Sequence, residues 1–351
     1  MRNGFAIIVK KKMNNLIKKS FKGKELKMKL KNVFYLYSGR VFILDNDGYQ
    51  IECTEMRDVA VDGKQHLEVR ESNDPHVVWK HLVEYKKKWL LTVSTQKGCT
   101  HNCLFCDVAN LPFKGNISQN EIENQIKFLL HNTDYVKECD KVKIGFARMG
   151  EPAHNLINVL NVIKRLPEIS SEQNKKFNWL PCFNTILPNQ CKHNPLEVLD
   201  NVVETKEKYY NGFLHLQISC NSTSEETRTK LFGGAKVLDL ESIINYIKKQ
   251  NITNRTTTLN FIVMENVEVD VNKLKSMGLT GDKFTVKLIP LNKTNNGEEN
   301  QLKTYANYSN YEKLLQLKDE FTNAGIPTVV DAIAKCEEAG LCCGQLVQIY
   351  Q

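Results

Sequence analysis

The sequence predicts an α/β fold in which parallel strands alternate with helices, preceded by a small β-rich region. Six apolar segments with strand-like composition follow one another, and stretches with helical periodicity separate them. Strands that alternate with helices pair in parallel through right-handed crossovers, so we expect either an open doubly wound sheet or a partial barrel. The expected strands are residues 89–95, 141–147, 178–186, 213–219, 258–264 and 284–291.

Length and composition indicate an ordinary globular protein with one large domain and a smaller part. The chain has 351 residues, of which 41% are hydrophobic and 25% charged. No apolar run reaches the roughly 18 to 20 residues that a membrane-spanning helix requires. The basic N-terminus also lacks the apolar core and cleavage site of a secretory signal. We therefore expect a cytoplasmic protein that does not associate with membranes.

The first 84 residues are expected to form a basic arm followed by a small β-rich accessory domain. Residues 1–31 contain Arg2 and ten lysines against a single acidic residue, Glu25. Such an arm can bind nucleic-acid phosphates, but it can equally have no partner, and charge alone leaves both open. The strand-like sequence of residues 33–69 is interrupted at Asn-Asp-Gly and Asp-Gly, which are signals for hairpin turns. The main domain is expected to comprise residues 85–351.

Helices are expected between the strands. Ser118 and Glu121 have the spacing of a capping box, ahead of an amphipathic run. The runs with helical periodicity include residues 122–130, 156–166, 240–250 and 311–321.

Three cysteines follow the first expected strand of the main domain, where a dinucleotide-binding protein would have a glycine-rich turn. Cys99, Cys103 and Cys106 form a single CxxxCxxC motif. A structural zinc site usually has four ligands in two pairs, and the second pair is missing here. Three thiolates can instead bind three irons of a 4Fe-4S cubane and leave the fourth iron open. A packed thiol cluster, or a zinc knuckle completed by His101, remain as alternatives.

With this motif in this place, the sequence resembles the radical S-adenosylmethionine (SAM) superfamily. Phe105 also matches the aromatic residue that these proteins usually carry before the last cysteine. The resemblance implies a partial (β/α)6 radical-SAM barrel, and a 4Fe-4S cluster held by Cys99, Cys103 and Cys106. It further implies that the open iron binds SAM, and that an electron donor such as flavodoxin or ferredoxin is a partner.

Further stretches resemble the rRNA adenine methylases of the RlmN and Cfr type. They are VSTQKGCTHNCLFC (93–106), RMGEP (148–152), ISCNSTSEETRTKLF (218–232), LIPLN (288–292) and CGQL (343–346). The combination covers the chain with gaps from about residue 91 to residue 346. It implies that the main domain ends in a loop carrying a catalytic cysteine, Cys343.

The resemblance assigns roles to particular residues. Cys343 would accept a methyl group from a first SAM as a nucleophilic thiolate. A 5′-deoxyadenosyl radical from a second SAM would abstract hydrogen from that methyl. The carbon radical would then add to an sp2 carbon of a purine, with adenine in RNA as a candidate. The residues implied in SAM binding are Gly150, Glu151, Asn184, Ser219, Asn221 and Asn292. We expect a monomer.

The sequence departs from these methylases in several places. Thr92 stands where they have a second catalytic cysteine, and a hydroxyl cannot form a disulfide with Cys343. Cys342 could substitute, although neighbouring cysteines pair only with strain. Asn184 replaces a serine and Asn221 a histidine, and both can still form hydrogen bonds. Their helical N-terminal domain has no recognisable counterpart, which makes RNA the weakest implied feature.

Alternatives to this interpretation therefore stay open. The chain could be a divergent radical SAM enzyme that does not use the methyl-cysteine route or does not act on RNA. It could also be a binding protein that keeps a cluster and a basic arm without catalysis. Glu151 could be an exposed loop carboxylate, and Asn292 a turn residue. The other cysteines are expected to be packed thiols, with a reservation for the last: Cys53, Cys139, Cys182, Cys191, Cys220 and Cys336.

Overall fold

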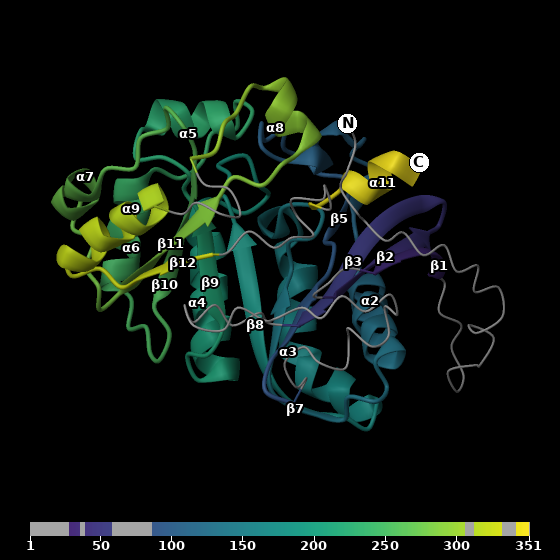
Figure 1. The fold of residues 1–351 in the computed structure, drawn as a ribbon. Helices are drawn as coiled ribbons and strands as arrows, with labels where there is room; N and C mark the ends of the chain where they lie inside the picture. The colour runs from purple at the N-terminus through teal and green to yellow at the C-terminus, as the bar shows by residue number, and fades with distance from the viewer. Residues whose placement is uncertain (1–27, 36–38, 58–85, 306–311, 332–341, 351) are drawn as a thin grey trace.

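The computed structural model describes residues 28–35, 39–57, 86–305, 312–331 and 342–350. Within these ranges the strands form one ten-stranded mixed sheet and one two-stranded sheet (Figure 1). Three features of the predicted N-terminal region lie outside the described residues. They are the basic arm up to residue 27, the strand-like sequence of residues 59–69 and the boundary between residues 84 and 85. The domain division therefore stays a prediction.

The expected β-rich region is present and extends the main sheet. It consists of β1 (Lys29–Tyr35), β2 (Gly39–Asn46) and β3 (Tyr49–Arg57), paired antiparallel in sequence order. Asp47 and Gly48 between β2 and β3 both have positive φ, 53° and 83°, as the Asn-Asp-Gly signal for a tight hairpin turn predicts. β3 then pairs antiparallel with the first strand of the main domain, so the two regions share one sheet.

All six expected strands of the main domain form, and they pair in parallel. They are β4 (Trp89–Thr92), β7 (Glu138–Gly145), β8 (Lys176–Thr185), β9 (His215–Ser219), β10 (Thr257–Val263) and β11 (Phe284–Pro290). A seventh, β12 (Thr328–Val330), pairs with β11 and was not predicted because its three residues are too few to show a pattern. Among the described residues no pairing joins β1 to β12, so the sheet is open.

Helices connect the strands as the periodicity predicted. They are α2 (Gln119–Asn132), α3 (Leu156–Glu172), α4 (Pro195–Tyr210), α5 (Glu225–Leu231), α6 (Leu240–Lys249), α7 (Val271–Ser276), α8 (Asn295–Glu299), α9 (Glu312–Asn323) and α11 (Gln345–Tyr350). The capping box of α2 is confirmed: the Glu121 carboxylate accepts from Ser118 N at 2.7 Å, and Ser118 Oγ accepts from Glu121 N at 3.4 Å. Across the described residues, none of the helices has both the length and the apolar character needed to cross a membrane.

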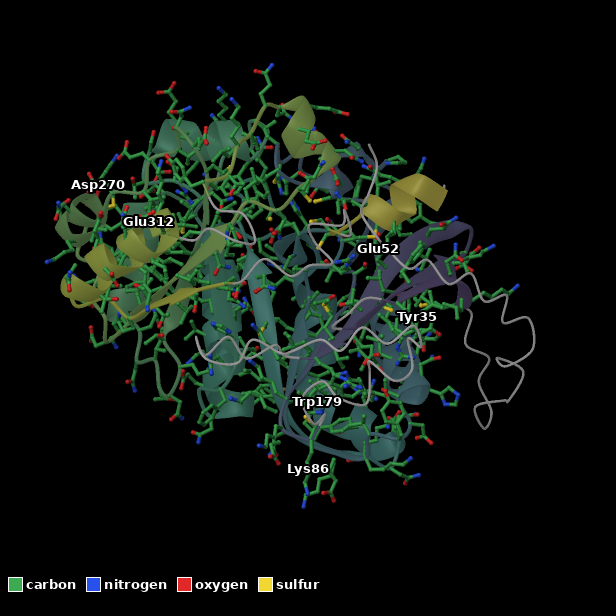
Figure 2. The ribbon with its side chains drawn as sticks, viewed as in Figure 1. Tyr35, Glu52, Lys86, Trp179, Asp270 and Glu312 are labelled. Carbon is green, nitrogen blue, oxygen red and sulfur yellow. The ribbon has the colours of Figure 1, made fainter. Side chains whose placement is uncertain are left out.

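The candidate site lies at the carboxyl ends of the parallel strands. The short strands β5 (Gln96–Lys97) and β6 (Gly115–Asn116) follow β4 at this end, and α8 and α11 contact the 3-10 helix η1 (Asp107–Asn110) that lies between them in the sequence. Figure 2 places Glu52 of β3 beside α11, whereas Lys86 and Trp179 lie at the opposite end. Loops that are far apart in the sequence meet here because every parallel strand points the same way.

Candidate active site

The three motif cysteines lie on the loop after β5, and this loop is tightly held. Gly98, just before the first of them, has φ +80°, and a Cβ there would lie 2.5 Å from the Pro112 carbonyl oxygen. Cys106 N donates to the Cys103 carbonyl at 3.1 Å, and the side chain of Asn296 on α8 donates to the same carbonyl at 2.8 Å. The loop is therefore fixed from outside the motif, by a residue that the sequence did not single out.

Burial raises the pKa of all three motif thiols. Burial raises the pKa of Cys99 to about 11, and the Glu151 carboxylate adds to the rise. Burial also raises the pKa of Cys103 well above its ordinary value, and Cys106 and Cys99 raise it further. The thiolate forms would repel one another, and a bound cationic centre stabilises them. The arrangement therefore fits an iron-sulfur cluster.

The zinc alternative is not supported. Across the described ranges, no three His, Cys, Asp or Glu side chains converge on the position of a single ion. His101 Nε2 instead lies 2.9 Å from His154 Nε2. A 4Fe-4S cluster needs no such convergence, because each thiolate binds a different iron.

The RMGEP loop buries a carboxylate next to these thiols. Gly150 has φ +95°, and a Cβ there would lie 2.5 Å from the Gln96 Cβ, so only glycine fits. Glu151 is 6% exposed, which makes its interpretation as an exposed loop carboxylate wrong. Its two oxygens accept from Ala153 N at 3.0 Å and from Ile186 N at 3.1 Å.

Burial raises the pKa of Glu151 to about 7, against the opposing hydrogen bonds from Thr185, Ala153 and Ile186. Among the described residues no lysine or arginine forms an ion pair with it. A buried carboxylate with a raised pKa in a strand-end loop is typical of a ligand site, here for a cationic group.

The polar residues expected to bind SAM lie at the ends of other strands. Asn184 lies near the end of β8, Ser219 ends β9, Asn221 follows it, and Asn292 follows β11. Asn184 Oδ1, Asn221 Nδ2 and Asn292 Oδ1 are buried and have no hydrogen-bond partner within the described part of the chain. Buried polar atoms are nearly always paired, so these orphaned atoms fit a polar ligand. Asn221 also has a structural role, since its Oδ1 accepts from Ile262 N at 3.1 Å.

The CGQL segment packs directly against the cysteine loop. Gly344 has φ +81°, and a Cβ there would lie 2.6 Å from Val108 Cγ2, two residues after Cys106. Gln345 Oε1 accepts from Cys342 N at 2.8 Å, its Nε2 donates to the Lys293 carbonyl at 3.1 Å, and Leu346 is buried. Each residue after the cysteine thus has a packing reason, and together they bring Cys343 to the cysteine loop.

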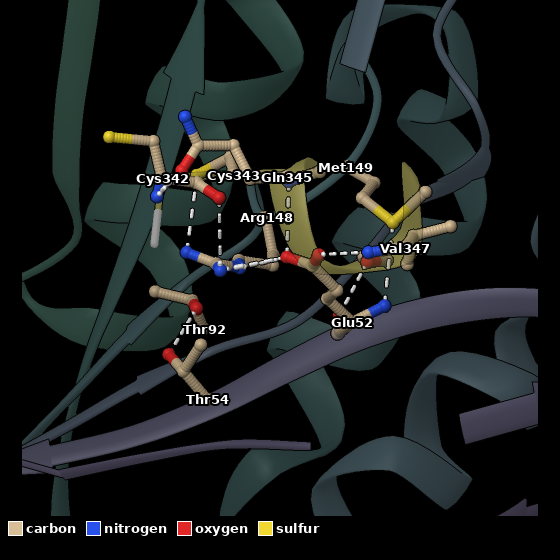
Figure 3. Close-up of polar contacts among 11 residues, drawn as sticks. Glu52, Thr54, Thr92, Arg148, Met149, Cys342, Cys343, Gln345 and Val347 are labelled. Atoms are coloured by element: carbon tan, nitrogen blue, oxygen red, sulfur yellow. Dashed lines mark hydrogen bonds and ion pairs between the residues drawn. The ribbon is translucent and has the colours of Figure 1, made fainter. Parts of the chain in front are cut away.

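Two observations concern the missing second cysteine. Thr92 Oγ1 lies 2.5 Å from Thr54 Oγ1 on β3, so the two hydroxyls are hydrogen-bonded (Figure 3). Cys342 Sγ lies 3.7 Å from the Lys293 carbonyl oxygen. The structure therefore leaves the role of Cys342 a prediction.

The remaining cysteines divide by burial. Cys53, Cys139, Cys182 and Cys220 are free and buried, as expected of packed thiols. Cys191 is partly exposed, with its Sγ 3.5 Å from His154 Nδ1. Cys336 lies outside the described residues.

Sequence reasoning missed two charged residues near Cys343. Arg148 Nη1 lies 3.5 Å from Cys343 Sγ, and Glu52 on β3 accepts from Arg148 Nε at 2.7 Å (Figure 3). Arg148 is the first residue of the RMGEP motif, but its partner Glu52 lies 96 residues earlier in the chain. The only sequence signal for Glu52 is an acidic residue inside an otherwise strand-like run.

Comparisons with known proteins identify relatives of the chain and a shared fold. No protein-family model matches the chain. The dual-specificity RNA methyltransferase RlmN of Sulfurimonas denitrificans is 27% identical over 252 residues, which cover 71% of this chain and 66% of that protein. RlmN of Campylobacter hominis is 29% identical over 211 residues, covering 59% and 54%. The probable RlmN of Pseudothermotoga lettingae is 24% identical over 316 residues, covering 88% and 82%.

The first two of these relatives are therefore matched over about half to two thirds of their own length. Among solved structures, a radical SAM methyltransferase from Sphaerobacter thermophilus superposes with a TM-score of 0.61 at 16% sequence identity, covering 91% of this chain and 81% of that one. This likeness shows that the two chains share a fold, and it supports the expected partial barrel.

Proposed function

We infer that this chain, an RlmN-like protein with the fold of a radical SAM methyltransferase, is itself a radical SAM methyltransferase with Cys343 as its methyl carrier. The observation that carries this proposal is the packing of Gly344 against Val108, which brings Cys343 to the loop of the cluster cysteines. Burial and the nearby Cys343 both raise the pKa of Cys106, which supports the same proximity.

The described residues fit both groups that such an enzyme binds. Cys99, Cys103 and Cys106 would hold a 4Fe-4S cluster. The predicted SAM ligands are Gly150, Glu151, Asn184, Ser219, Asn221 and Asn292. When bound, the cluster would supply the electron that cleaves SAM to a 5′-deoxyadenosyl radical. Glu151 would hold the cationic amino group of SAM, which stabilises the ionised form of a carboxylate whose pKa burial has raised.

Cys343 would act as the nucleophile of the first step. Its sulfur forms a bond to the methyl carbon of SAM while the bond from that carbon to the sulfonium breaks, and S-adenosylhomocysteine leaves. The thiolate becomes a neutral thioether, so this step needs no oxidant. The 5′-deoxyadenosyl radical from a second SAM would take one hydrogen atom from this methyl group and become 5′-deoxyadenosine. The carbon radical left on the sulfur would then add to an electron-poor sp2 carbon.

The proposed acceptor is a purine. The relatives are named RNA methyltransferases, which supports RNA as the carrier of that base, and the resemblance to rRNA adenine methylases suggests adenine. A specific observation favours a second possibility for the later steps. Thr92, hydrogen-bonded to Thr54, cannot form a disulfide with Cys343, so product release must differ from the route that uses a second cysteine. A divergent enzyme that uses another route or another acceptor is therefore the alternative proposal. The electron donor, the cytoplasmic location and the monomeric state remain predictions.

The experiment is anaerobic reconstitution with iron and sulfide, followed by incubation with SAM and mass spectrometry of the peptide that contains Cys342 and Cys343. We expect one added methyl on Cys343, its loss in Cys343→Ala, and its retention in the matched control Cys342→Ala. An unmodified Cys343 alongside accumulating 5′-deoxyadenosine would refute the carrier role and support the divergent enzyme.

A further inference from the structure

A buried ion pair lies beneath the loop that carries Cys343 (Figure 3). Glu52 on β3 is fully buried, and Arg148, in the loop after β7, is 8% exposed. Arg148 Nε and Nη2 both lie 2.7 Å from Glu52 Oε2. A buried pair loses its hydration, and it is stable only where further hydrogen bonds satisfy both partners. The additional partners of this pair are therefore informative.

The additional partners of Glu52 are backbone amides of the carrier loop. Gly344 N donates to Glu52 Oε2 at 3.1 Å, and Val347 N donates to Glu52 Oε1 at 3.1 Å. One carboxylate thus holds the backbone on both sides of Gln345. Because Glu52 lies in the middle of a paired strand, it attaches the end of the chain to the rigid sheet.

The additional partners of Arg148 are the carrier cysteine and its neighbour. Arg148 Nη1 lies 3.5 Å from Cys343 Sγ, and Nη2 lies 3.5 Å from the Cys342 carbonyl. Burial by itself would lower the pKa of the Arg148 guanidinium, but Glu52 and the two cysteines outweigh it and keep the pKa above its ordinary value. A permanent positive charge next to a sulfur favours the thiolate, which is the nucleophilic form.

We propose that Glu52 and Arg148 are positioning residues of the methyl carrier: Glu52 fixes the carrier loop to β3, and Arg148 holds the Cys343 sulfur as the thiolate that accepts the methyl group. This inference rests on the proposed function, because it explains how the Cys343 thiolate is positioned and stabilised before it accepts the methyl group. It also gives the β-rich region a direct part in the active site.

The first test measures Cys343 without cluster or SAM. We compare the rate of alkylation of Cys343 by iodoacetamide at neutral pH in wild type and Arg148→Met, using peptide-resolved mass spectrometry with Cys191 as internal reference. A hydrogen bond to a charged group predicts that the variant reacts about tenfold more slowly. Arg148→Lys should recover part of the rate, and the control Arg165→Met, which removes a guanidinium on α3, should leave it unchanged. Equal rates in wild type and Arg148→Met would overturn the proposal.

Removal of one member of a buried pair can prevent folding, so a second variant is needed. Glu52→Gln combined with Arg148→Met removes both charges and leaves none unpaired. If this double variant folds and Cys343 alkylates about tenfold more slowly, the proposal stands. Hydrogen exchange of residues 344–347 should also become faster in Glu52→Gln. Unchanged exchange would overturn the role of Glu52.

The loaded enzyme separates this inference from the proposed function. Arg148→Met should methylate Cys343 about tenfold more slowly while it still cleaves SAM to 5′-deoxyadenosine, because the cysteines of the cluster loop are untouched. A general loss of structure would reduce both rates together. A wild-type protein that never methylates Cys343 would refute the proposed function, whatever the alkylation rates are. Normal methylation in Arg148→Met would refute only the positioning role.

Discussion

Substitution of Gly344 by alanine should disable the carrier loop without unfolding the protein. Gly344 has φ +81°, and an alanine Cβ would lie 2.6 Å from Val108 Cγ2 and 3.0 Å from Val108 N. The left-handed backbone costs a non-glycine residue roughly 1–2 kcal/mol. Overpacking at a tight contact costs a further 1–3 kcal/mol or so. The docked loop should therefore lose about 2–5 kcal/mol, which lowers its population by roughly thirtyfold or more if docking is marginal.

The assay is the rate of Cys343 methylation by SAM, followed by peptide mass spectrometry, with thermal unfolding measured in parallel. A matched control separates backbone strain from the clash. Gly325 has φ +80° but nothing within 4 Å of its Cβ position, so Gly325→Ala should show only a small loss of stability and normal methylation. If Gly344→Ala methylates Cys343 as fast as wild type, the packing of the carrier loop on the cysteine loop does not matter for transfer.

The remaining predictions concern the cofactor, the cluster and the fold. Glu151 should be neutral below its raised pKa of about 7, so SAM affinity should rise by close to tenfold per pH unit up to about pH 7 and level off above it. Equilibrium dialysis across this range should show a flat profile for Glu151→Gln. An equally steep profile in this variant would contradict the assignment. Cys103→Ser should lose the visible absorbance and bound iron of the reconstituted protein, whereas the control Cys191→Ser should retain them; iron retention in Cys103→Ser would refute its role as a ligand. Ser118→Ala should lower the free energy of unfolding by about 1 kcal/mol through loss of the α2 cap, without an effect on methylation, as chemical denaturation would show.

Much of the architecture could be predicted because local pattern controls it. The six parallel strands of the main domain are apolar runs of sufficient length, and the hairpin between β2 and β3 follows from an Asn-Asp-Gly turn that tolerates positive φ. β12 was not predicted from the sequence, because a strand of three residues shows no periodicity. The pairing of β3 with β4 was also not predicted, because the order of strands in a sheet depends on contacts between distant segments.

Most of the residues of the candidate site could be predicted from the sequence, but their surroundings could not. Motif spacing singled out Cys99, Cys103 and Cys106, and the resemblance to the RlmN and Cfr type methylases singled out Gly150, Glu151 and Cys343. Spacing says nothing of what surrounds a side chain, and only the tertiary structure showed that Glu151 is buried and that Gly344 packs on Val108.

The sequence by itself determined which chemical groups this protein has and the strands and loops on which they lie, because turns, caps and periodicities are local properties of the chain. The tertiary structure alone decided which groups meet. Glu52 and Arg148 are 96 residues apart, and Glu52 bonds Gly344 across 292 residues. Such contacts arise when the sheet orders its strands and the end of the chain returns to them, and their hydrogen-bond geometry depends on the packing of the whole domain.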